Sequence, residues 1–225
     1  RIARQAPPRL GQADLAQQFL GAPQRRTTAE AEVLRDSILR AAGLLSYRMG
    51  GPGVRPPQPD GITEAAYGQP KWNASAGEDR HRRSVYTYLK RTAPFAFFNT
   101  FDAPSGEACI ARRDTANTPL QALTVLNDVL MVEASQALGR RFAEEKQPDS
   151  DRLIHLFRRC LARTPTAQEL GELNGFLAKQ RQRFQSGELD AAKVSGATGD
   201  TSVERAAWTT LARVLLNVDE FVTKG

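Results

Sequence analysis

The sequence contains few cysteines and histidines, residues that often bind metals or take part in nucleophilic catalysis. It has two cysteines and two histidines in 225 residues. Cys109 and Cys160 stand in no CxxC or CxxCH arrangement, which excludes a zinc cluster of that type and covalent haem attachment within these residues. His81 and His155 have no ligand partner three or four positions away, so we expect no metal site. A Gly-rich phosphate loop after a strand and a GxSxG nucleophile elbow are also missing.

The two cysteines allow two interpretations. A disulfide between Cys109 and Cys160 would stabilise the fold by about 4 kcal/mol through loop closure, provided that the compartment is oxidising. Two buried free thiols agree with the sequence equally well.

Long apolar runs are absent as well. No run approaches the roughly 18 residues that a membrane-spanning helix needs. With 40% hydrophobic residues, 25% charged residues and a mean hydropathy of −0.46, the composition is that of a globular chain long enough to bury a core. The chain begins at Arg1 without an apolar signal region, and we therefore interpret it as a fragment of a longer protein.

Positive charge is unevenly distributed. The net charge of +6 arises in residues 1–115, which hold 17 basic and 11 acidic side chains, whereas residues 116–225 hold 14 of each. A basic half favours polyanionic partners. However, 25 of the 31 basic residues are Arg, which also fits a coding bias. Because no nucleic-acid recognition motif accompanies the charge, we expect no nucleic acid as a partner, and an acidic or sulfated polysaccharide stays open.

The first half of the chain predicts one helix and much irregular structure. Thr27 and Glu30 have the spacing of a capping box, and the apolar periodicity that follows predicts a helix over about 28–46. Residues 50–70 contain ten Gly and Pro residues, so this stretch is a long loop. Residues 84–89 and the aromatic stretch 95–101 predict one or two short strands, paired as a ribbon on the helices.

The second half predicts a helical bundle. Pro119, with Asn117 or Thr118 as the N-cap, opens a helix that continues to about Glu145, with a break at Asn127-Asp128, which could cap a second segment. Further helices are predicted from near Ser150, from a capping box at Thr166 and Glu169, and over about 202–217, with a mobile stretch at 186–201.

The fold class is therefore mainly α, a C-terminal helical bundle with an irregular loop-rich segment that carries one or two short β-strands. We expect a single domain over 27–225, made of the irregular part 27–115 and the bundle 116–225. Residues 1–26 are a lead-in that belongs to a larger upstream region.

Several segments carry a family resemblance. They are MGGPGV at 49–54, RRSVYTYLKR at 82–91, FDAP at 101–104, NTPLQAL at 117–123, LND at 126–128, and the closing stretch 208–221. Over about 27–225 the chain resembles the planctomycete C-terminal domain of unknown function 1553 (PSD-one type), found in large cytochrome-c-linked proteins. The resemblance implies an exported, extracytoplasmic parent, periplasmic or at the cell surface. It also implies a haem c module upstream, and no cofactor in this fragment.

One polar cluster is the candidate ligand site. Two guanidinium groups immediately before a helix N-terminus would direct fixed donors and a positive dipole end at one anionic group, such as a uronate carboxylate or a sulfate. The candidate residues are Arg112, Arg113, Asn117, Thr118, Gln121 and Asn127. The alternative is structural: the polar residues cap helices and loops, and the arginines pair with nearby carboxylates.

Two further patterns are less specific. Asp102 and Glu107 could act as the acid and base of glycoside hydrolysis, although their spacing in a loop does not fix the distance that this reaction requires. Met49, Tyr67 and Trp72 could form a sugar-stacking platform, but we interpret them as a lid on the core.

Three functions follow from these observations. The first is a non-catalytic interaction or scaffolding module of an exported cytochrome-linked protein, whose partners are the upstream domains of the same polypeptide. The second is a part of a carbohydrate-active or redox enzyme whose active site needs those upstream domains. The third is a polyanion-binding module.

Overall fold

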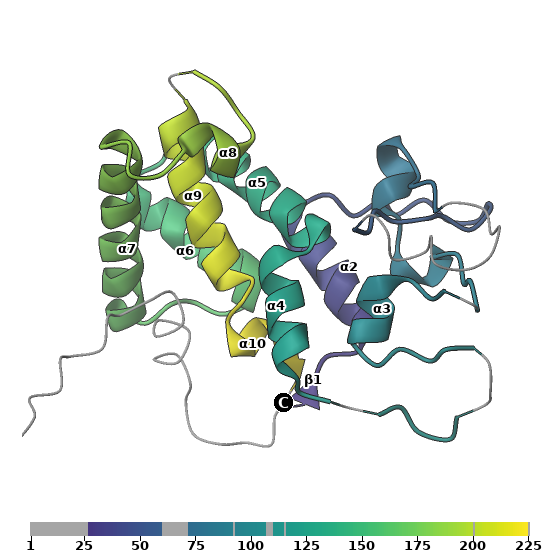
Figure 1. Cartoon of the computed structure of the whole chain (residues 1–225). Helices are drawn as coiled ribbons and strands as arrows, with labels where there is room; N and C mark the ends of the chain where they lie inside the picture. Colours follow the sequence, from purple (N-terminus) through teal and green to yellow (C-terminus); the bar gives the residue numbers. More distant parts are fainter. Residues whose placement is uncertain are drawn as a thin grey trace, which may run out of the picture.

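A two-stranded antiparallel ribbon joins the two ends of the described chain. The computed structural model describes residues 27–59, 72–91, 93–106, 110–114, 116–199 and 201–224. Strand β1 (Thr27–Thr28) pairs with β2 (Thr223–Lys224), so that Thr27 lies opposite Lys224. The backbone N–H of Ala29 extends the pairing by donating to the carbonyl of Val222 at 2.9 Å. The first and last described segments are therefore neighbours in space (Figure 1).

Helix α2 (Ala31–Ala42) follows β1 directly. Its apolar residues Leu34, Ile38 and Leu39 recur at helical spacing and are buried, which confirms the predicted helix over a shorter range. The predicted capping box of Thr27 and Glu30 is wrong. Because Thr27 lies in β1, Glu30 is the N-cap and makes no side-chain capping bond.

The second half of the chain is the predicted helical bundle, and the fold is mainly α. Its helices are α4 (Pro119–Asn127), α5 (Val129–Glu144), α6 (Asp149–Leu161), α7 (Ala167–Gln185), α8 (Ala191–Ser195), α9 (Ser202–Leu215) and α10 (Asp219–Val222). The predicted break lies between α4 and α5, where the extended backbone of Asp128 ends one helix and its carboxylate caps the next. The capping boxes at Thr118 and Thr166 are present. Helix α8, capped by Asp190, was not predicted.

The closest packing in the bundle is between α5 and α9. A Cβ atom at Gly139 would lie 2.0 Å from Oγ1 of Thr209 and 2.8 Å from its Cα, so only glycine allows this approach. Trp208 is fully buried beside this contact and stacks on Phe142, with ring centroids 5.9 Å apart. The two helices thus form the centre of the core.

The predicted ribbon at 84–89 and 95–101 is wrong. The first segment contains the 3₁₀ turn η2 (Ser84–Tyr86), and the second forms the short helix α3 (Ala96–Thr100). Phe97 and Phe101 are buried on one side of α3, with ring centroids 4.8 Å apart. Burial of these rings at helical spacing therefore outweighs the β-propensity of the aromatic residues.

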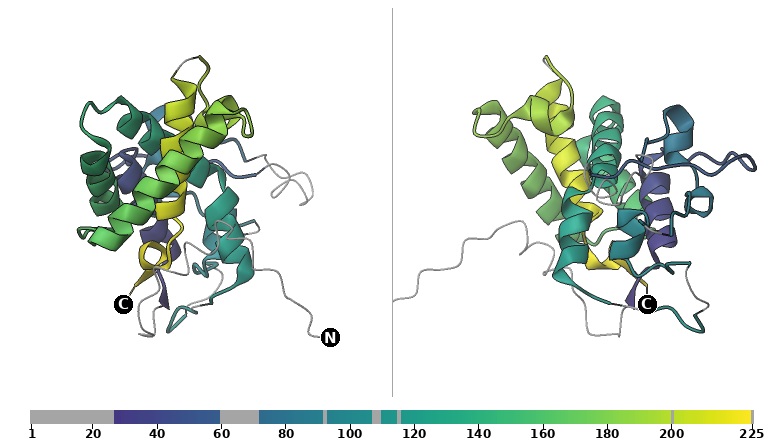
Figure 2. Two further views of the ribbon diagram at one scale, coloured as in Figure 1. Left: turned by 90° about the vertical axis from the view of Figure 1, so that its left-hand side faces the viewer. Right: turned by 45° about the vertical axis from the view of Figure 1, so that its right-hand side comes forward.

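Helix α2 connects the bundle to the irregular part of the chain. It packs on α5 on one side and on η2 and α3 on the other. Figures 1 and 2 show the loops and short helices of the first half gathered on that second side, away from α6, α7 and α8. The buried residues of α2, α3 and the bundle form one hydrophobic cluster.

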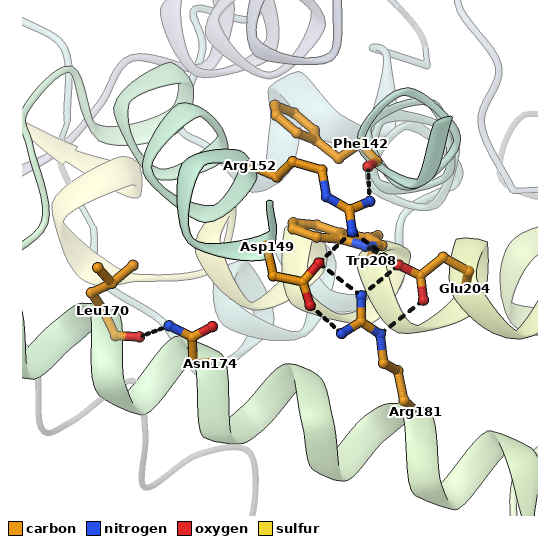
Figure 3. A network of polar contacts seen from close by, with 8 residues as sticks. All are labelled: Phe142, Asp149, Arg152, Leu170, Asn174, Arg181, Glu204 and Trp208. Atoms are coloured by element: carbon orange, nitrogen blue, oxygen red, sulfur yellow. Dashed lines mark hydrogen bonds and ion pairs between the residues drawn. The ribbon is translucent and has the colours of Figure 1, made fainter. Parts of the chain in front are cut away.

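A network of charged side chains holds α6, α7 and α9 together (Figure 3). The guanidinium of Arg181 on α7 donates to Asp149 at the start of α6 and to Glu204 on α9, at 3.2 Å and 2.8 Å respectively. Glu204 also accepts the indole N–H of Trp208 at 2.8 Å. Arg152 bonds Asp149 as well, donates to the carbonyl of Phe142 at 2.8 Å, and stacks over Trp208.

The network fixes the charge state of its carboxylates. Hydrogen bonds from Arg181 hold the pKa of Asp149 below its ordinary value. Burial raises the pKa of Glu204, but the bonds from Arg181 and Trp208 outweigh it, and the net pKa is lowered. Both groups are therefore ionised at neutral pH, and the network stabilises the bundle.

We expect Arg181→Met to lower the free energy of unfolding by about 1–3 kcal/mol near neutral pH, because two partly buried carboxylates lose their shared partner. Since the folded pKa values are lowered, this stabilisation is present above the ordinary carboxyl pKa and is lost as the pH falls through the lowered values. Urea unfolding near neutral pH and at about pH 3 should therefore show a difference between wild type and variant that shrinks in acid.

The matched control is Arg183→Met on the same helix, because among the described residues Arg183 forms an ion pair with the exposed Glu188 alone. This control should change stability little. Equal losses in the two variants would contradict the assigned role of the network.

Candidate functional site

A buried arginine on α2 organises the loops that follow. The side chain of Arg35 is 1% exposed. Its guanidinium donates to the carbonyl of Arg82 at 2.8 Å, to the carbonyl of Arg80 at 3.1 Å and to Oγ of Ser84 at 3.2 Å. Next to it, the carboxylate of Asp36 accepts the backbone N–H of Ser84 at 2.8 Å. One turn of α2 therefore fixes the backbone of residues 80–84.

The charge of Arg35 is kept although it is buried. Burial lowers its pKa to about 10, and the negative charges of Asp36 and Asp128 oppose that shift. Asp128 is buried too, and the loss of solvent raises the pKa of its carboxyl group. Arg35 therefore remains a cation at neutral pH.

Arg82, whose carbonyl is bound by Arg35, holds the loop at 48–52 with its own side chain. Its side chain is also 1% exposed and donates to the carbonyls of Arg48, Gly50 and Pro52. The guanidinium lies 3.9 Å from the ring centroid of Tyr86, in cation–π geometry. The hydroxyl oxygen of Tyr86 in turn accepts the backbone N–H of Gly50 at 2.9 Å.

Two isolated parallel bridges complete this frame. Ser46 pairs with Arg82, and Val54 pairs with Thr87. Beyond Val54, the indole N–H of Trp72 donates to the carbonyl of Pro56 at 2.7 Å. We call residues 44–59 and 72–91 together the front surface.

The side chain of Trp72 is partly buried and faces the hydrophobic core. Its ring stacks on Phe95 with centroids 6.0 Å apart, and it packs against the hydrophobic core, as the lid interpretation expects. Met49 is instead 78% exposed, and Tyr67 lies outside the described residues.

The front surface exposes large apolar side chains. Ten such side chains are exposed in the described part of the chain, and five of them lie here. They are Tyr47, Met49, Val85, Tyr88 and Leu89. Large exposed apolar side chains on one ordered region favour an interaction site.

Ion pairs anchor the frame to α5. Arg80 and Nε2 of His81 both contact the carboxylate of Glu133, His81 at 3.3 Å. Burial raises the pKa of Glu133, but the hydrogen bonds from His81 and Arg80 lower it by more. His81 thus has a structural partner, and His155 lies at 3.9 Å from Glu145. Within the described ranges, no group of three His, Cys, Asp or Glu side chains could hold a metal ion.

Most residues of the predicted anion site have structural partners, and Asn127 lies away from the others. Thr118 caps α4 by accepting the N–H of Gln121 at 3.2 Å. Gln121 is buried, accepts the N–H of Thr118 and donates to the carbonyl of Thr100 at 3.0 Å. Asn127 lies at the other end of α4, where it donates to Leu123 and accepts from Arg213. Asn117 is exposed before α4.

The two predicted arginines lie beside the start of the described chain. Arg113 makes a two-bond pair with Glu32 on α2 at 2.7 and 3.1 Å, and these bonds raise its pKa. Arg112 is exposed and has no hydrogen bond or ion pair with any described residue. Both line a cavity of about 310 Å³ together with Asp102 and Lys224. Among the described residues of the predicted cluster, Arg112 and Asn117 are exposed and make no side-chain hydrogen bond or ion pair, and of these two Arg112 carries the charge that an anion would need.

Asp102 stabilises the loop before α4. It has a left-handed backbone with φ of +55°, and its carboxylate accepts the N–H of Ala116 at 2.8 Å. Glu107, its predicted partner in acid–base chemistry, lies outside the described residues, as does Cys109. Cys160 is a free cysteine, and burial raises the pKa of its thiol to about 12.

Sequence reasoning missed Arg35 and Arg82. The signal for Arg35 was present, because it lies next to Leu34 and three or four positions before Ile38 and Leu39, on the apolar stripe of its helix. An arginine at such a position is either paired or in contact with backbone carbonyls. Arg82 offered no such signal, because its segment has no regular periodicity.

A family model described as PSD1, protein of unknown function (DUF1553), matches residues 1–177. The match includes residues 1–26 and ends within α7, so the closing stretch 208–221 lies outside it. No curated protein and no solved structure matches the chain.

We expect Arg82→Met to release the loop at 48–54 while the bundle stays folded. The variant leaves three carbonyls without their donor, which should cost about 1–3 kcal/mol and raise the amide exchange rate at Gly50 and Val54. Hydrogen exchange followed by mass spectrometry would measure this, with helical circular dichroism as the test of the bundle.

The neighbouring Arg83 gives the matched control, because it is half-exposed and its one ion pair within the described ranges, with Asp36, is 4.0 Å long. Arg83→Met should leave exchange at Gly50 unchanged. If both variants loosened the loop alike, net charge rather than the buried contacts of Arg82 would hold it.

Proposed function

This chain belongs to the PSD1 family, a family of unknown function (DUF1553), and we propose that it is a non-catalytic interaction module. The observation that carries the proposal is the front surface, where five large apolar side chains stand exposed on a frame fixed by buried arginines. Exposed apolar groups are costly in water unless a partner covers them.

The frame supports binding because it is ordered before any partner arrives. Arg35 and Arg82 hold the loops through carbonyl groups, so the side chains around Met49 and Val85 need little further ordering. A preordered surface loses less conformational entropy on association, which raises affinity for a given contact area.

The partner that we propose is the upstream part of the same polypeptide. The resemblance to cytochrome-linked proteins supports this choice, together with export of the parent from the cytoplasm. In the described ranges, no helix is long and apolar enough to cross a membrane. Domain interfaces within one chain are moderate in size and contain both apolar and charged groups, and the front surface offers both, with Arg48 and Arg83 beside the apolar side chains.

A binding measurement in trans tests the proposal. The upstream part of the parent polypeptide is produced separately, and its affinity for this chain is measured by calorimetry. Met49→Ser combined with Val85→Ser should weaken binding about tenfold or more, because the pair removes the most exposed apolar contacts.

The control uses equally apolar residues on another face. Leu120 and Leu123 on α4 are 61% and 55% exposed, so their double serine variant removes similar apolar area away from the front surface. It should leave the affinity unchanged. The proposal fails if the upstream part does not bind, or if only the α4 variant loses binding.

A second candidate function, the binding of an acidic or sulfated polysaccharide, is favoured by Arg112. Its guanidinium is free of partners among the described residues and lies at a cavity before α4. The affinity for a sulfated oligosaccharide should fall steeply with salt and be reduced by Arg112→Gln. An affinity that does not depend on salt would count against this candidate.

A further inference from the structure

A further cavity lies at the edge of the front surface, with which it shares Leu45 and Tyr47. It is a cleft of about 460 Å³ between the C-terminal ends of α2 and α6. Arg40 and Gly43 line it from the end of α2, Arg159 and Cys160 from α6, and Phe221 from α10. A volume of this size is sufficient for a small organic molecule.

The cleft is positively charged. Arg40 and Arg159 line it, and no acidic side chain does. The guanidinium of Arg40 is without a partner among the described residues. Arg159 uses Nε and Nη2 to bind the carbonyls of Ala41 and Arg40, which leaves its Nη1 group available.

Like charges surround Arg159. Burial lowers its pKa, and the positive charges of Arg141 and Arg40 lower it further. The carboxylate of Glu145 opposes this shift, but it also pairs with Arg141 at 3.6 Å and with His155 at 3.9 Å. An anion bound between Arg40 and Arg159 would reduce the repulsion between these like charges.

The walls of the cleft are suited to a ring. Tyr47 and Phe221 present aromatic side chains, and Ser37 adds a hydroxyl that makes no bond within the described chain. The thiol of Cys160 adds no competing negative charge, since burial raises its pKa to about 12.

We propose that this cleft binds a small organic anion, with its carboxylate against Arg40 and Arg159 and its ring between Tyr47 and Phe221. A sugar acid and an aromatic carboxylate share this chemistry. The cleft shares Tyr47 with the front surface, but the inference needs neither the upstream polypeptide nor the side chains Met49 and Val85, which the binding test of the proposed function changes.

The test uses the 225-residue chain with glucuronate and benzoate as probes. Glucose and benzyl alcohol serve as their neutral counterparts. Titration calorimetry should show saturable binding of at least one anion and no binding of its neutral counterpart. The anion that binds shows whether the site accepts a sugar acid or an aromatic carboxylate.

Two variants locate the site. Arg40→Gln should weaken the anion about tenfold or more, which is the effect of losing a charge-assisted hydrogen bond. Arg158→Gln removes the same charge from the exposed side of α6, outside the cleft lining, and should change the affinity less than twofold. Because Arg40 is exposed, both variants should keep the fold, which circular dichroism checks.

The inference is overturned if neither anion binds, if the neutral compounds bind equally well, or if the two variants weaken binding alike. Loss of upstream binding by the Met49 and Val85 variant would leave this result untouched, so the two proposals fail separately.

Discussion

The contact between the Arg35 guanidinium and the carbonyls of Arg80 and Arg82 is the constraint on which the first half of this protein depends. An irregular segment has no ladder of backbone bonds, so its buried carbonyls need donors from elsewhere. A guanidinium suits this task because its five N–H groups point in fixed, different directions within one plane. A lysine at the same place would offer a single ammonium and could not reach both carbonyls and the hydroxyl of Ser84.

Helix α2 therefore joins the bundle to the front surface, although the bundle has a regular helical sequence pattern and the front surface is rich in glycine and proline. Leu34, Ile38 and Leu39 bury α2 in the core, and Arg35 between them projects to the loops. Arg82 repeats the arrangement one layer further out, around Gly50 and Pro52. The shape of the exposed surface is thus set by the position of α2 on α5. This explains how a chain with 17 glycines and 13 prolines can hold a defined loop surface through bonds from arginine side chains to backbone carbonyls.

What the sequence predicts well is local. The caps at Thr118 and Thr166 and the break at Asp128 depend on contacts within a few residues, and all three are present. The ribbon at 84–89 and 95–101 fails because the burial of Phe97 and Phe101 depends on residues far away in the sequence. For the same reason, spacing alone could not separate Arg113, which pairs with Glu32 across 81 positions, from Arg112. The two-residue strands β1 and β2 are too short to leave any pattern in the sequence.

The ribbon of β1 and β2 determines how the protein responds to being pulled. Its strands run antiparallel with Thr27 opposite Lys224, so tension on the polypeptide at both ends would separate the outermost pair first and then open the next. In this unzipping geometry the bonds break one after another, whereas strands loaded in shear share the force among all of them. A small force would therefore open the ribbon and lengthen the chain by a few residues before any load reached α2.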